Sequence, residues 1–361
     1  MSYPKLTIDY TKIKANAKII LSLCKKRDLS VTGVIKGLSG DVKLANILHT
    51  AGYSHIASSR ISQLKNIKPF LPLSDLMLIR TPMLSELDDV IDYSGISLHS
   101  EKRVLKELNN KCIKKKVFHK IILMYDVGDL REGILNEDEL LALAKYVEFE
   151  LENVHLYGVG INLTCYGTVV PSLSNAKKLS LVAKSIESVI GRKLEIISGG
   201  STTSLPLIAK TPLPDKINNL RIGAAIIAPI ELPLLWGITI EGLYNDAITI
   251  EGEIIEINSK PTVPIGELNV DGFGKRRNFA DKGIRKRAIV AIGNADVGDC
   301  TNLVPKDNHT YVLGASSDHL LLDIEDCDLD YSIGDTIKFF MHYQNILFSM
   351  NQPDVTKIHI N

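Results

Sequence analysis

The chain has 361 residues, 45% of them hydrophobic and 23% charged, and its 42 basic and 42 acidic side chains give a formal net charge of zero. These proportions exclude a mainly disordered chain, and the balanced charge provides no general attraction to nucleic acid or anionic lipid. No apolar run reaches the ~18 residues of a membrane span. The N-terminus has no signal-peptide core, so we expect a cytoplasmic protein.

Cysteine and histidine spacing gives no sign of a metal centre. The five cysteines are widely spaced without a CxxC pair, and the nine histidines form no HxxxH pair. This pattern indicates neither a disulfide framework nor a thiolate zinc site, and we expect no metal.

Strand and helix patterns alternate over the first two thirds of the chain. Apolar, β-branched runs predict strands, and amphipathic stretches predict helices between them. The expected strands are 29–36, 55–59, 76–82, 95–100, 118–127, 153–163, 194–200 and 219–227. The expected helices are 11–26, 41–51, 60–71, 84–94, 101–115, 136–151, 174–191 and 203–211. This alternation predicts an α/β fold, a (β/α)8 TIM barrel over residues 10–230.

After about residue 230 the pattern changes to strands with almost no helix. The expected strands, separated by turns rich in Gly, Asp and Asn, are 246–257, 287–293, 310–314, 319–324 and 335–343. This predicts a smaller all-β C-terminal domain over 231–361. The short strand at 6–9 is available to pair with it, so we assign residues 1–9 to the same domain.

Charged and polar residues close several barrel strands, where the catalytic groups of such barrels lie. Lys36 follows the first strand. Burial would lower the pKa of its ammonium and allow a Schiff base, although a lysine extending from the barrel mouth gives the same pattern. Arg131 follows the fifth strand and would either bind a ligand or pair with Asp126 or Asp129. Asn162 follows the sixth and would either bind a ligand or cap a turn.

The segments after the seventh and eighth strands are rich in small residues. They contain Gly200, Ser201 and Thr202, and then Arg221, Gly223 and Ala224. Small residues before a helix start present free backbone N–H groups that bind phosphate, and barrels often bind phosphate at these two loops. No GxxxxGK[ST] loop is present, and 158–163 lacks the third glycine of a dinucleotide fingerprint. Together with Lys36, the pattern fits a phosphorylated carbonyl cofactor, and pyridoxal phosphate meets both requirements.

Four motifs carry a resemblance to a known family. They are VTGVIKG (31–37), YDVGDLREG (125–133), SGGSTTSLP (198–206) and LRIGAAI (220–226). In order and spacing they resemble segments of the alanine racemase-like, fold type III pyridoxal-phosphate enzymes. Within that family the sequence is most similar to the ornithine racemase branch, and the resemblance covers essentially the whole chain.

The resemblance implies a role for each matching residue. Lys36 would be the Schiff-base lysine, Arg131 would contact the phenolic oxygen of the cofactor, and Arg221 would face its pyridine nitrogen. The residues implied to bind phosphate are Gly200, Ser201, Thr202, Gly223, Ala224 and Tyr343. An arginine at the pyridine nitrogen disfavours protonation of that nitrogen, which suits rapid reprotonation at Cα. This favours racemisation over transamination.

The sequence departs from the family at the second catalytic group. Alanine racemases place a tyrosine of the other subunit there, but TVPIGELNVDGFGK (262–275) contains none. Because two-base racemisation needs an acid/base group on each face, Asp271 is the candidate and Glu267 follows, with turn residues as the alternative. Cys165 could approach the site, or be a buried structural cysteine. Ser39 stands where the family usually has another tyrosine, so the substrate could differ from alanine.

The sequence therefore predicts an amino-acid racemase that depends on pyridoxal phosphate and exchanges the Cα proton. Ornithine or another basic amino acid is the favoured substrate, with alanine next. The family forms head-to-tail dimers, so the resemblance implies a homodimer with shared active sites. The alternatives are a decarboxylase of the same fold, against which Arg221 argues, and a non-catalytic pyridoxal-phosphate carrier, against which the C-terminal domain argues.

Overall fold

A computed structural model describes residues 2–361, and the chain divides into two compact units. The barrel unit is Ile13–Leu243, and the β unit combines the N-terminal segment up to Lys12 with Tyr244–Asn361. The barrel unit is thus inserted in the chain between the first strand and the rest of the β unit. The barrel unit ends at Leu243, beyond α10 (Glu231–Trp236). The sequence had placed this boundary at residue 230.

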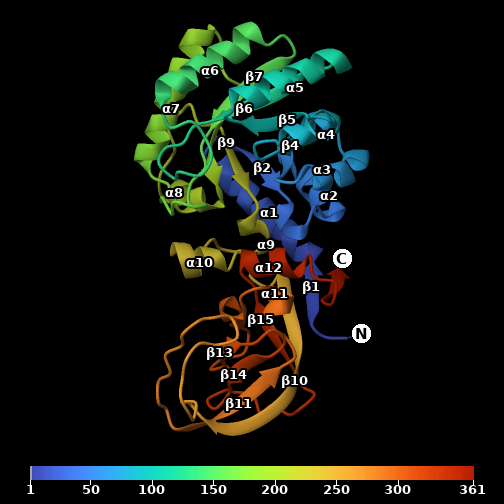
Figure 1. Ribbon diagram of the computed structural model, residues 1–361, viewed down its shortest axis with the longest axis vertical. Helices are drawn as coiled ribbons and strands as arrows, with labels where there is room; N and C mark the ends of the chain where they lie inside the picture. The colour runs from blue at the N-terminus through green and yellow to red at the C-terminus, as the bar shows by residue number, and fades with distance from the viewer. Residues whose placement is uncertain (1) are drawn as a thin grey trace. The chain divides into compact units, whose positions relative to one another are not determined.

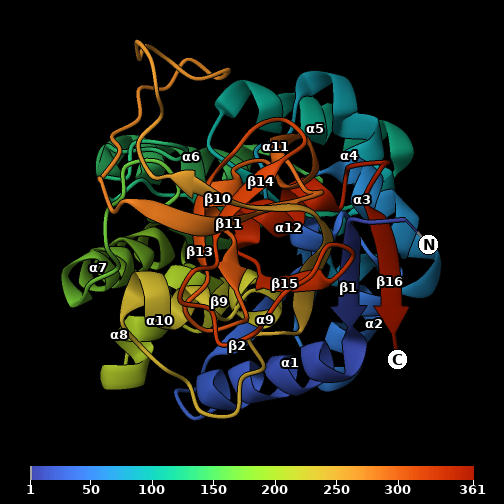
Figure 2. The ribbon, with the colours of Figure 1, turned by 90° about the horizontal axis from the view of Figure 1, so that it is seen from below.

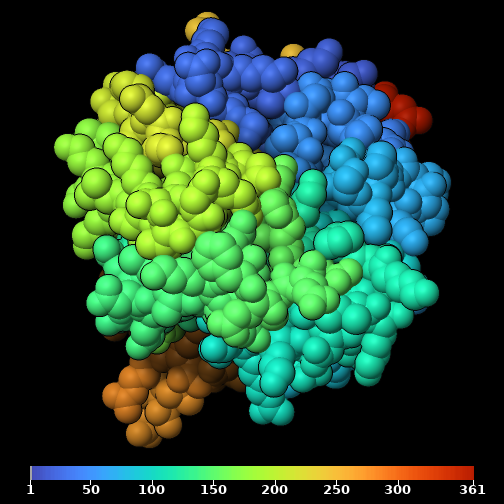
Figure 3. All heavy atoms as spheres, turned by 90° about the horizontal axis from the view of Figure 1, so that it is seen from above, coloured from blue at the N-terminus to red at the C-terminus, as the bar shows by residue number. Residues whose placement is uncertain are grey.

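Eight parallel strands close into a barrel in the order β2-β3-β4-β5-β6-β7-β8-β9. They are β2 (Ser30–Val34), β3 (His55–Ser58), β4 (Leu76–Leu78), β5 (Ile96–His99), β6 (His119–Met124), β7 (Val154–Gly160), β8 (Ile196–Ser201) and β9 (Asn219–Ile222). Parallel pairing of β2 with β9 completes the closure. In Figure 3 the colours follow one another around a ring in chain order, as expected of a barrel. The predicted (β/α)8 fold is confirmed.

Helices follow the barrel strands and surround them (Figure 1). They are α1 (Tyr10–Lys25), α2 (Val42–Ala51), α3 (Ile61–Ile67), α4 (Leu87–Tyr93), α5 (Lys102–Lys115), α6 (Glu137–Glu150), α7 (Leu173–Ile190), α8 (Leu205–Lys210) and α9 (Ala224–Ile227). Local sequence sets several ends: Asp41 caps α2 by accepting the Leu44 N–H at 2.6 Å, and Gly191 ends α7 in the left-handed conformation. Between residues 2 and 361, no helix combines the length and apolarity needed to cross a membrane.

Apolar side chains from six of the strands form one buried cluster. Its members are Val34, Ala57, Met77, Ile96, Leu98, Ile122, Met124 and Ile196. Because these strands lie on several sides of the barrel, the cluster packs the barrel interior. Side chains alternate along a strand, so Ser97 and His99 lie on the opposite, helix-covered face of β5. The packed interior leaves the strand ends as the place for function.

The β unit contains a sheet of eight strands with the order β12-β15-β10-β11-β14-β13, and β1 pairs with both β10 and β16. The strands are β1 (Lys5–Asp9), β10 (Ile248–Pro261), β11 (Ile284–Val290), β12 (Val304–Pro305), β13 (Tyr311–Ala315), β14 (Leu320–Asp323), β15 (Thr336–Phe340) and β16 (Thr356–Ile360). Two helices, α11 (Asn294–Val297) and α12 (Tyr343–Ser349), accompany them. Figure 2 shows β1 beside β16 and the long connection between β10 and β11, here called the arm (residues 262–283). The predicted β domain is confirmed, with β12, β16, α11 and α12 not foreseen.

Candidate active site

Lys36 begins a single 3-10 turn, Lys36–Leu38, directly after β2. The backbone is anchored on both sides, because the Ile35 N–H donates to the Ala57 carbonyl at 2.9 Å and the Ser39 N–H to the Lys36 carbonyl at 3.1 Å. Burial is the largest cause that lowers the pKa of the Lys36 ammonium. Smaller influences on this pKa come from charged or polar neighbours, which therefore lie close: Cys165, Arg131, Glu132 and Arg221.

Arg221 projects from β9 and is fixed by two hydrogen bonds within the barrel. Its side chain is buried, with the residue only 5% exposed. Nη1 donates to Ser198 Oγ at 2.5 Å, and Nη2 donates to the Ile161 carbonyl at 2.7 Å. Ser198 in turn donates to Asn219 Oδ1 at 2.9 Å. Burial lowers the pKa of Arg221 to about 10, so the guanidinium remains charged at neutral pH.

Arg131 and Asn162 meet at a carboxylate that the sequence did not single out. Glu132 accepts hydrogen bonds from Arg131 Nε and Nη2, the latter at 2.5 Å, and from Asn162 Nδ2 at 3.2 Å. The alternative pairing of Arg131 with Asp126 is therefore wrong, because Asp126 Oδ1 accepts the N–H groups of the following turn instead. The sequence feature that could have identified Glu132 is its place directly after Arg131, close to a strand end.

Cys165 lies on the loop between β7 and α7 and is exposed. Its Sγ accepts a hydrogen bond from Asn162 Nδ2 at 3.3 Å, and the thiol influences the pKa of Lys36. The alternative of a buried structural cysteine is therefore wrong. The barrel unit thus brings together four of the predicted residues: Lys36, Arg131, Asn162 and Arg221.

Two glycines let the turns after β8 and β9 approach their neighbours. Gly200 has φ +118°, and a Cβ there would lie 2.6 Å from Ser204 Oγ. A Cβ on Gly223 would lie 2.7 Å from the carbonyl oxygen of Val34, on the strand that leads to Lys36. The two turns also contact each other, because the Ala225 N–H donates to Thr202 Oγ1 at 3.4 Å. A larger residue at Gly200 would clash within its own turn, and one at Gly223 would clash with Val34 on β2.

The predicted phosphate residues occupy these turns. Ser201 closes β8, Thr202 opens a 3-10 turn, and Ala224 begins α9 directly after Gly223. Ser201 Oγ and Thr203 Oγ1 lie 3.2 Å apart. The starts of helical turns present N–H groups without helical partners. Three cationic side chains, Lys36, Arg131 and Arg221, lie on or after β2, β6 and β9. This donor set suits an anionic group placed beside the Lys36 amine.

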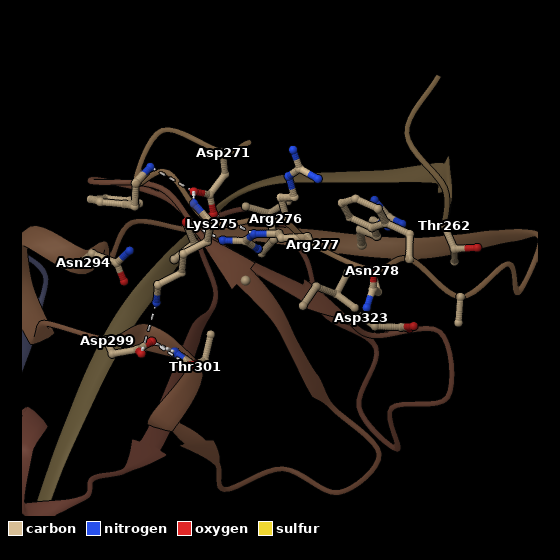
Figure 4. A pocket seen from close by; sticks show the side chains of 18 of the residues that line it. Thr262, Asp271, Lys275, Arg276, Arg277, Asn278, Asn294, Asp299, Thr301 and Asp323 are labelled. Carbon is tan, nitrogen blue, oxygen red and sulfur yellow. Dashed lines mark hydrogen bonds and ion pairs between the residues drawn. The ribbon is translucent and has the colours of Figure 1, made fainter. Parts of the chain in front are cut away.

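Asp271 belongs to the arm of the β unit, where it lines a cavity of about 510 Å³ (Figure 4). Its Oδ1 accepts the N–H groups of Phe273 and Lys275, both at 2.9 Å, and its Oδ2 pairs with Arg277 Nε at 2.9 Å. These bonds, led by the one from Lys275, lower the pKa of the Asp271 carboxyl. A carboxylate with a lowered pKa is a weak proton acceptor, so the geometry favours the turn-forming alternative.

Tyr343 is the first residue of α12, and Glu267 is exposed on the arm. Both belong, with Asp271, to the β unit. None of the three is part of the group assembled within the barrel unit, which consists of side chains and turns at the ends of β2, β6, β7, β8 and β9.

The fold and its strand-end groups define a class: a TIM barrel whose strand-end donors suit an anionic group beside a half-buried lysine, in a chain that also contains an all-β unit. The sequence model of the protein family "Alanine racemase, N-terminal domain" matches residues 8–228. The chain belongs to this family, which confirms the resemblance seen in the sequence.

Two relatives match the chain over nearly its whole length. The ornithine racemase of Acetoanaerobium sticklandii is 40% identical over 355 residues, covering 98% of this chain and 99% of that protein. The lysine racemase of Thermotoga maritima is 35% identical over 359 residues, covering 99% of each. Both relatives are amino-acid racemases, as the sequence led us to expect.

Solved structures show the same two-part fold at low identity. Alanine racemase from Streptomyces lavendulae superposes with a TM-score of 0.72 at 14% identity, covering 100% of this chain and 98% of that one. A D-threonine aldolase from Filomicrobium marinum gives a TM-score of 0.76 at 12% identity, covering 99% and 91%. At such identities these structures support the fold alone.

Proposed function

We propose that the protein is an amino-acid racemase that uses pyridoxal phosphate and acts on ornithine, with another basic amino acid or alanine as the next substrates. The carrying observation is a lysine of lowered pKa beside a buried arginine, Arg221, whose hydrogen bonds go to a hydroxyl and a carbonyl. The basic substrate is supported by the names of the two full-length relatives, ornithine racemase and lysine racemase.

The residues at the strand ends fit the proposed cofactor. Lys36 would hold it covalently, Arg131 and Asn162 would bind its ring substituents, and Arg221 would face the ring nitrogen. Its phosphate would take N–H and hydroxyl donors from Gly200, Ser201, Thr202, Gly223, Ala224 and Tyr343. When bound, pyridoxal phosphate supplies an electron sink that acidifies the Cα–H bond of an amino acid.

The side chains of this protein would then move the proton. Burial favours the neutral form of the Lys36 amine, and a neutral amine can accept the Cα proton on one face and return it. Arg221 keeps its charge at neutral pH and would therefore leave the ring nitrogen unprotonated. That arrangement limits charge delocalisation and favours return of the proton to Cα.

A second group must serve the opposite face, and we propose Asp271 for it, with Glu267 next. Asp271 lies in the segment of the arm where the family resemblance puts the second catalytic group, which supports this role. The hydrogen bonds that Asp271 accepts argue against the role. If Asp271 is the second base, Asp271→Asn should lower racemisation at least about 100-fold, measured from both enantiomers. A variant that keeps full activity in both directions would remove Asp271 from this role.

We also propose a homodimer with shared sites. The arm exposes apolar side chains, with Ile265 92% exposed and Leu268, Val270 and Phe273 about half exposed, and such patches mark interaction surfaces. Sedimentation analysis would test the dimer. Mixing Lys36→Ala protein with an arm-deleted protein tests sharing, because only shared sites can regain activity in mixed dimers. The cytoplasmic location stays a prediction from the N-terminal sequence.

The deciding experiment incubates the holoprotein with single L-amino acids in deuterated water, followed by chiral chromatography and mass spectrometry. Formation of D-ornithine with deuterium at Cα is the expected result. Release of carbon dioxide would indicate a decarboxylase, and a yellow protein inert to every amino acid would indicate a carrier. Borohydride reduction and peptide mapping should place the cofactor adduct on Lys36, and an adduct elsewhere would contradict that assignment.

A further inference from the structure

A buried carboxylate joins two loops at the mouth of the barrel. Asp129 lies on the loop between β6 and α6, two residues before Arg131, and is only 2% exposed. Its Oδ1 accepts backbone N–H bonds from Thr164 at 2.8 Å and Val169 at 3.3 Å, and its Oδ2 accepts one from Tyr166 at 3.2 Å. All three donors belong to the loop between β7 and α7. One side chain therefore holds a loop 35 to 40 residues away in the sequence.

The held loop is shaped to fit this carboxylate. A Cβ on Gly167 would lie 2.4 Å from the Asp129 carbonyl oxygen, so the two backbones are in direct contact. Thr164 and Thr168 have φ values of 68° and 54°, a left-handed conformation that is unfavourable for β-branched residues. Such conformations persist only where surrounding bonds enforce them. The bonds to Asp129 supply that constraint at one end of the loop.

The two loops carry three groups that influence the pKa of Lys36, and a fourth, Asn162, that is bonded to two of them. Arg131 and Glu132 belong to the first loop, and Asn162 and Cys165 to the second. The loops also meet through the side chains, because Asn162 Nδ2 donates to Glu132 at 3.2 Å. Any shift of the second loop would displace Asn162 and Cys165 from Glu132 and Lys36.

We propose that Asp129 is a positioning residue: its carboxylate fixes the β7–α7 loop against the β6–α6 loop and thereby sets the place of Asn162 against Glu132 and that of Cys165 near Lys36. The importance of those places rests on the function proposed above, whereas the contact between the loops can be measured without cofactor or substrate.

The requirement is for an anion with two acceptor oxygens. In Asp129→Asn the amide oxygen can accept only part of the set, and the amide nitrogen would oppose a backbone N–H as a second donor. We expect the amides of 164–169 to exchange with solvent at least tenfold faster in the cofactor-free protein. The thiolate form of Cys165 would raise the pKa of Lys36 through its charge, so release of the loop should also lower this pKa.

The experiment compares wild type, Asp129→Asn and the control Ser172→Ala. Ser172 caps α7 at the far end of the same loop, so its variant reproduces a loss of helix stability without touching the contacts of Asp129. Amide exchange measured by mass spectrometry reports the protection of residues 164–169. Titration with pyridoxal phosphate at several pH values measures the affinity for the cofactor and its pH dependence. We expect about tenfold weaker cofactor binding and a pH profile moved to lower pH in Asp129→Asn, with Ser172→Ala close to wild type.

Unchanged exchange of 164–169 would overturn the proposal, as would faster exchange with an unchanged cofactor affinity and pH profile. If Asp129→Asn does not fold, Gly167→Ala tests the same contact, because its Cβ would push the loop away while the charge remains. A wild-type protein that racemises no amino acid would contradict the proposed function but leave the exchange result intact.

Discussion

Lys36 shares its surroundings with two arginines and one carboxylate, so its proton affinity depends on Glu132. Arg131 and Arg221 lower the pKa of Lys36, whereas Glu132 raises it. Glu132 also occupies Arg131 through two donors, Nε and Nη2, which partly offsets the repulsion between Arg131 and Lys36. The Glu132 carboxylate thus reduces the electrostatic repulsion among Lys36, Arg131 and Arg221 before any anionic ligand binds.

Replacing the Glu132 carboxylate should change the pKa of Lys36. In Glu132→Gln the amide oxygen can still accept from Asn162, but the charge is lost, and the pKa of Lys36 should fall further. We expect the acid limb of the pH profile for cofactor binding to move to lower pH and the affinity to weaken about tenfold, as for loss of a charge-assisted hydrogen bond. Absorbance titration measures both.

Glu139→Gln is the matched control, because Glu139 is an exposed residue in the first turn of α6. An acid limb that moves to higher pH in Glu132→Gln, or moves equally in the control, would contradict the assigned influence of Glu132.

Sequence reasoning singled out the cationic residues at the strand ends, but it did not single out Glu132 and gave Asp129 only as a possible partner of Arg131. Lys36 stands out because a charge that closes an apolar barrel strand is unusual, and Arg131 and Arg221 stand out through the family motifs in which they lie. Glu132 and Asp129 gain their importance from Asn162 and Thr164, which are 30 and 35 residues further along the chain. No pattern in the sequence states which two loops meet, so these contacts needed the structure.

At the scale of elements, β5 and β6 share a polar cluster beneath the helices. Ser97 Oγ lies 2.8 Å from Nε2 of His99 and 2.8 Å from Nε2 of His119, and all three residues are buried. A hydroxyl has one proton, so it donates to one imidazole and accepts from the other. Burial lowers the pKa of His99 to about 3 and that of His119 to about 4. Both rings are therefore neutral in the folded protein.

This cluster should make the barrel unit sensitive to acid. The unfolded histidines take up protons below about pH 6.5, whereas the folded ones stay neutral until about pH 4 and 3. Stability from the pair is fully present above pH 6.5 and falls as the pH decreases toward the folded pKa values. Between pH 6.5 and 4.5 the loss from both rings would reach about 5 kcal/mol in the free energy of unfolding.

Denaturant unfolding at several pH values tests this expectation. His119→Gln should remove about half of the loss, because its amide can hydrogen bond to Ser97 without titrating. His309→Gln is the control, since His309 is exposed, and should retain the wild-type slope. Equal slopes for all three proteins would show that other groups cause the acid sensitivity.

The helices and strands that local sequence patterns determine could be predicted. Those that depend on contacts with distant parts of the chain were missed. The barrel strands follow from apolar runs between amphipathic helices. Strand β16 has five residues and pairs with β1, at the other end of the chain. Helix α12 begins where a strand was expected to end, and its buried Asn345 donates to the carbonyls of Val297 and Asp299, both at 2.9 Å. Partners remote in sequence therefore define both elements.

At the scale of the whole molecule, the β unit is assembled from both ends of the chain around the inserted barrel sequence. Strand β1 pairs antiparallel with β10 through Lys5–Ile8 and parallel with β16 through Lys5–Asp9. It is therefore the link between β16 and the rest of the sheet among the described residues. The expectation that residues 6–9 pair with the C-terminal strands matches this register.

Weakening β1 should therefore loosen the β unit first. Leu6 and Ile8 are fully buried, and truncating a buried leucine or isoleucine to alanine costs about 2–5 kcal/mol. We expect Leu6→Ala to speed amide exchange in β16 and β10 well beyond any change in the barrel strands, measured by mass spectrometry of proteolytic peptides. Thr7→Ala is the matched control, because Thr7 alternates to the less buried face. Faster exchange spread evenly over both units would mean that the stability of the barrel depends on β1, and that the two units unfold as one.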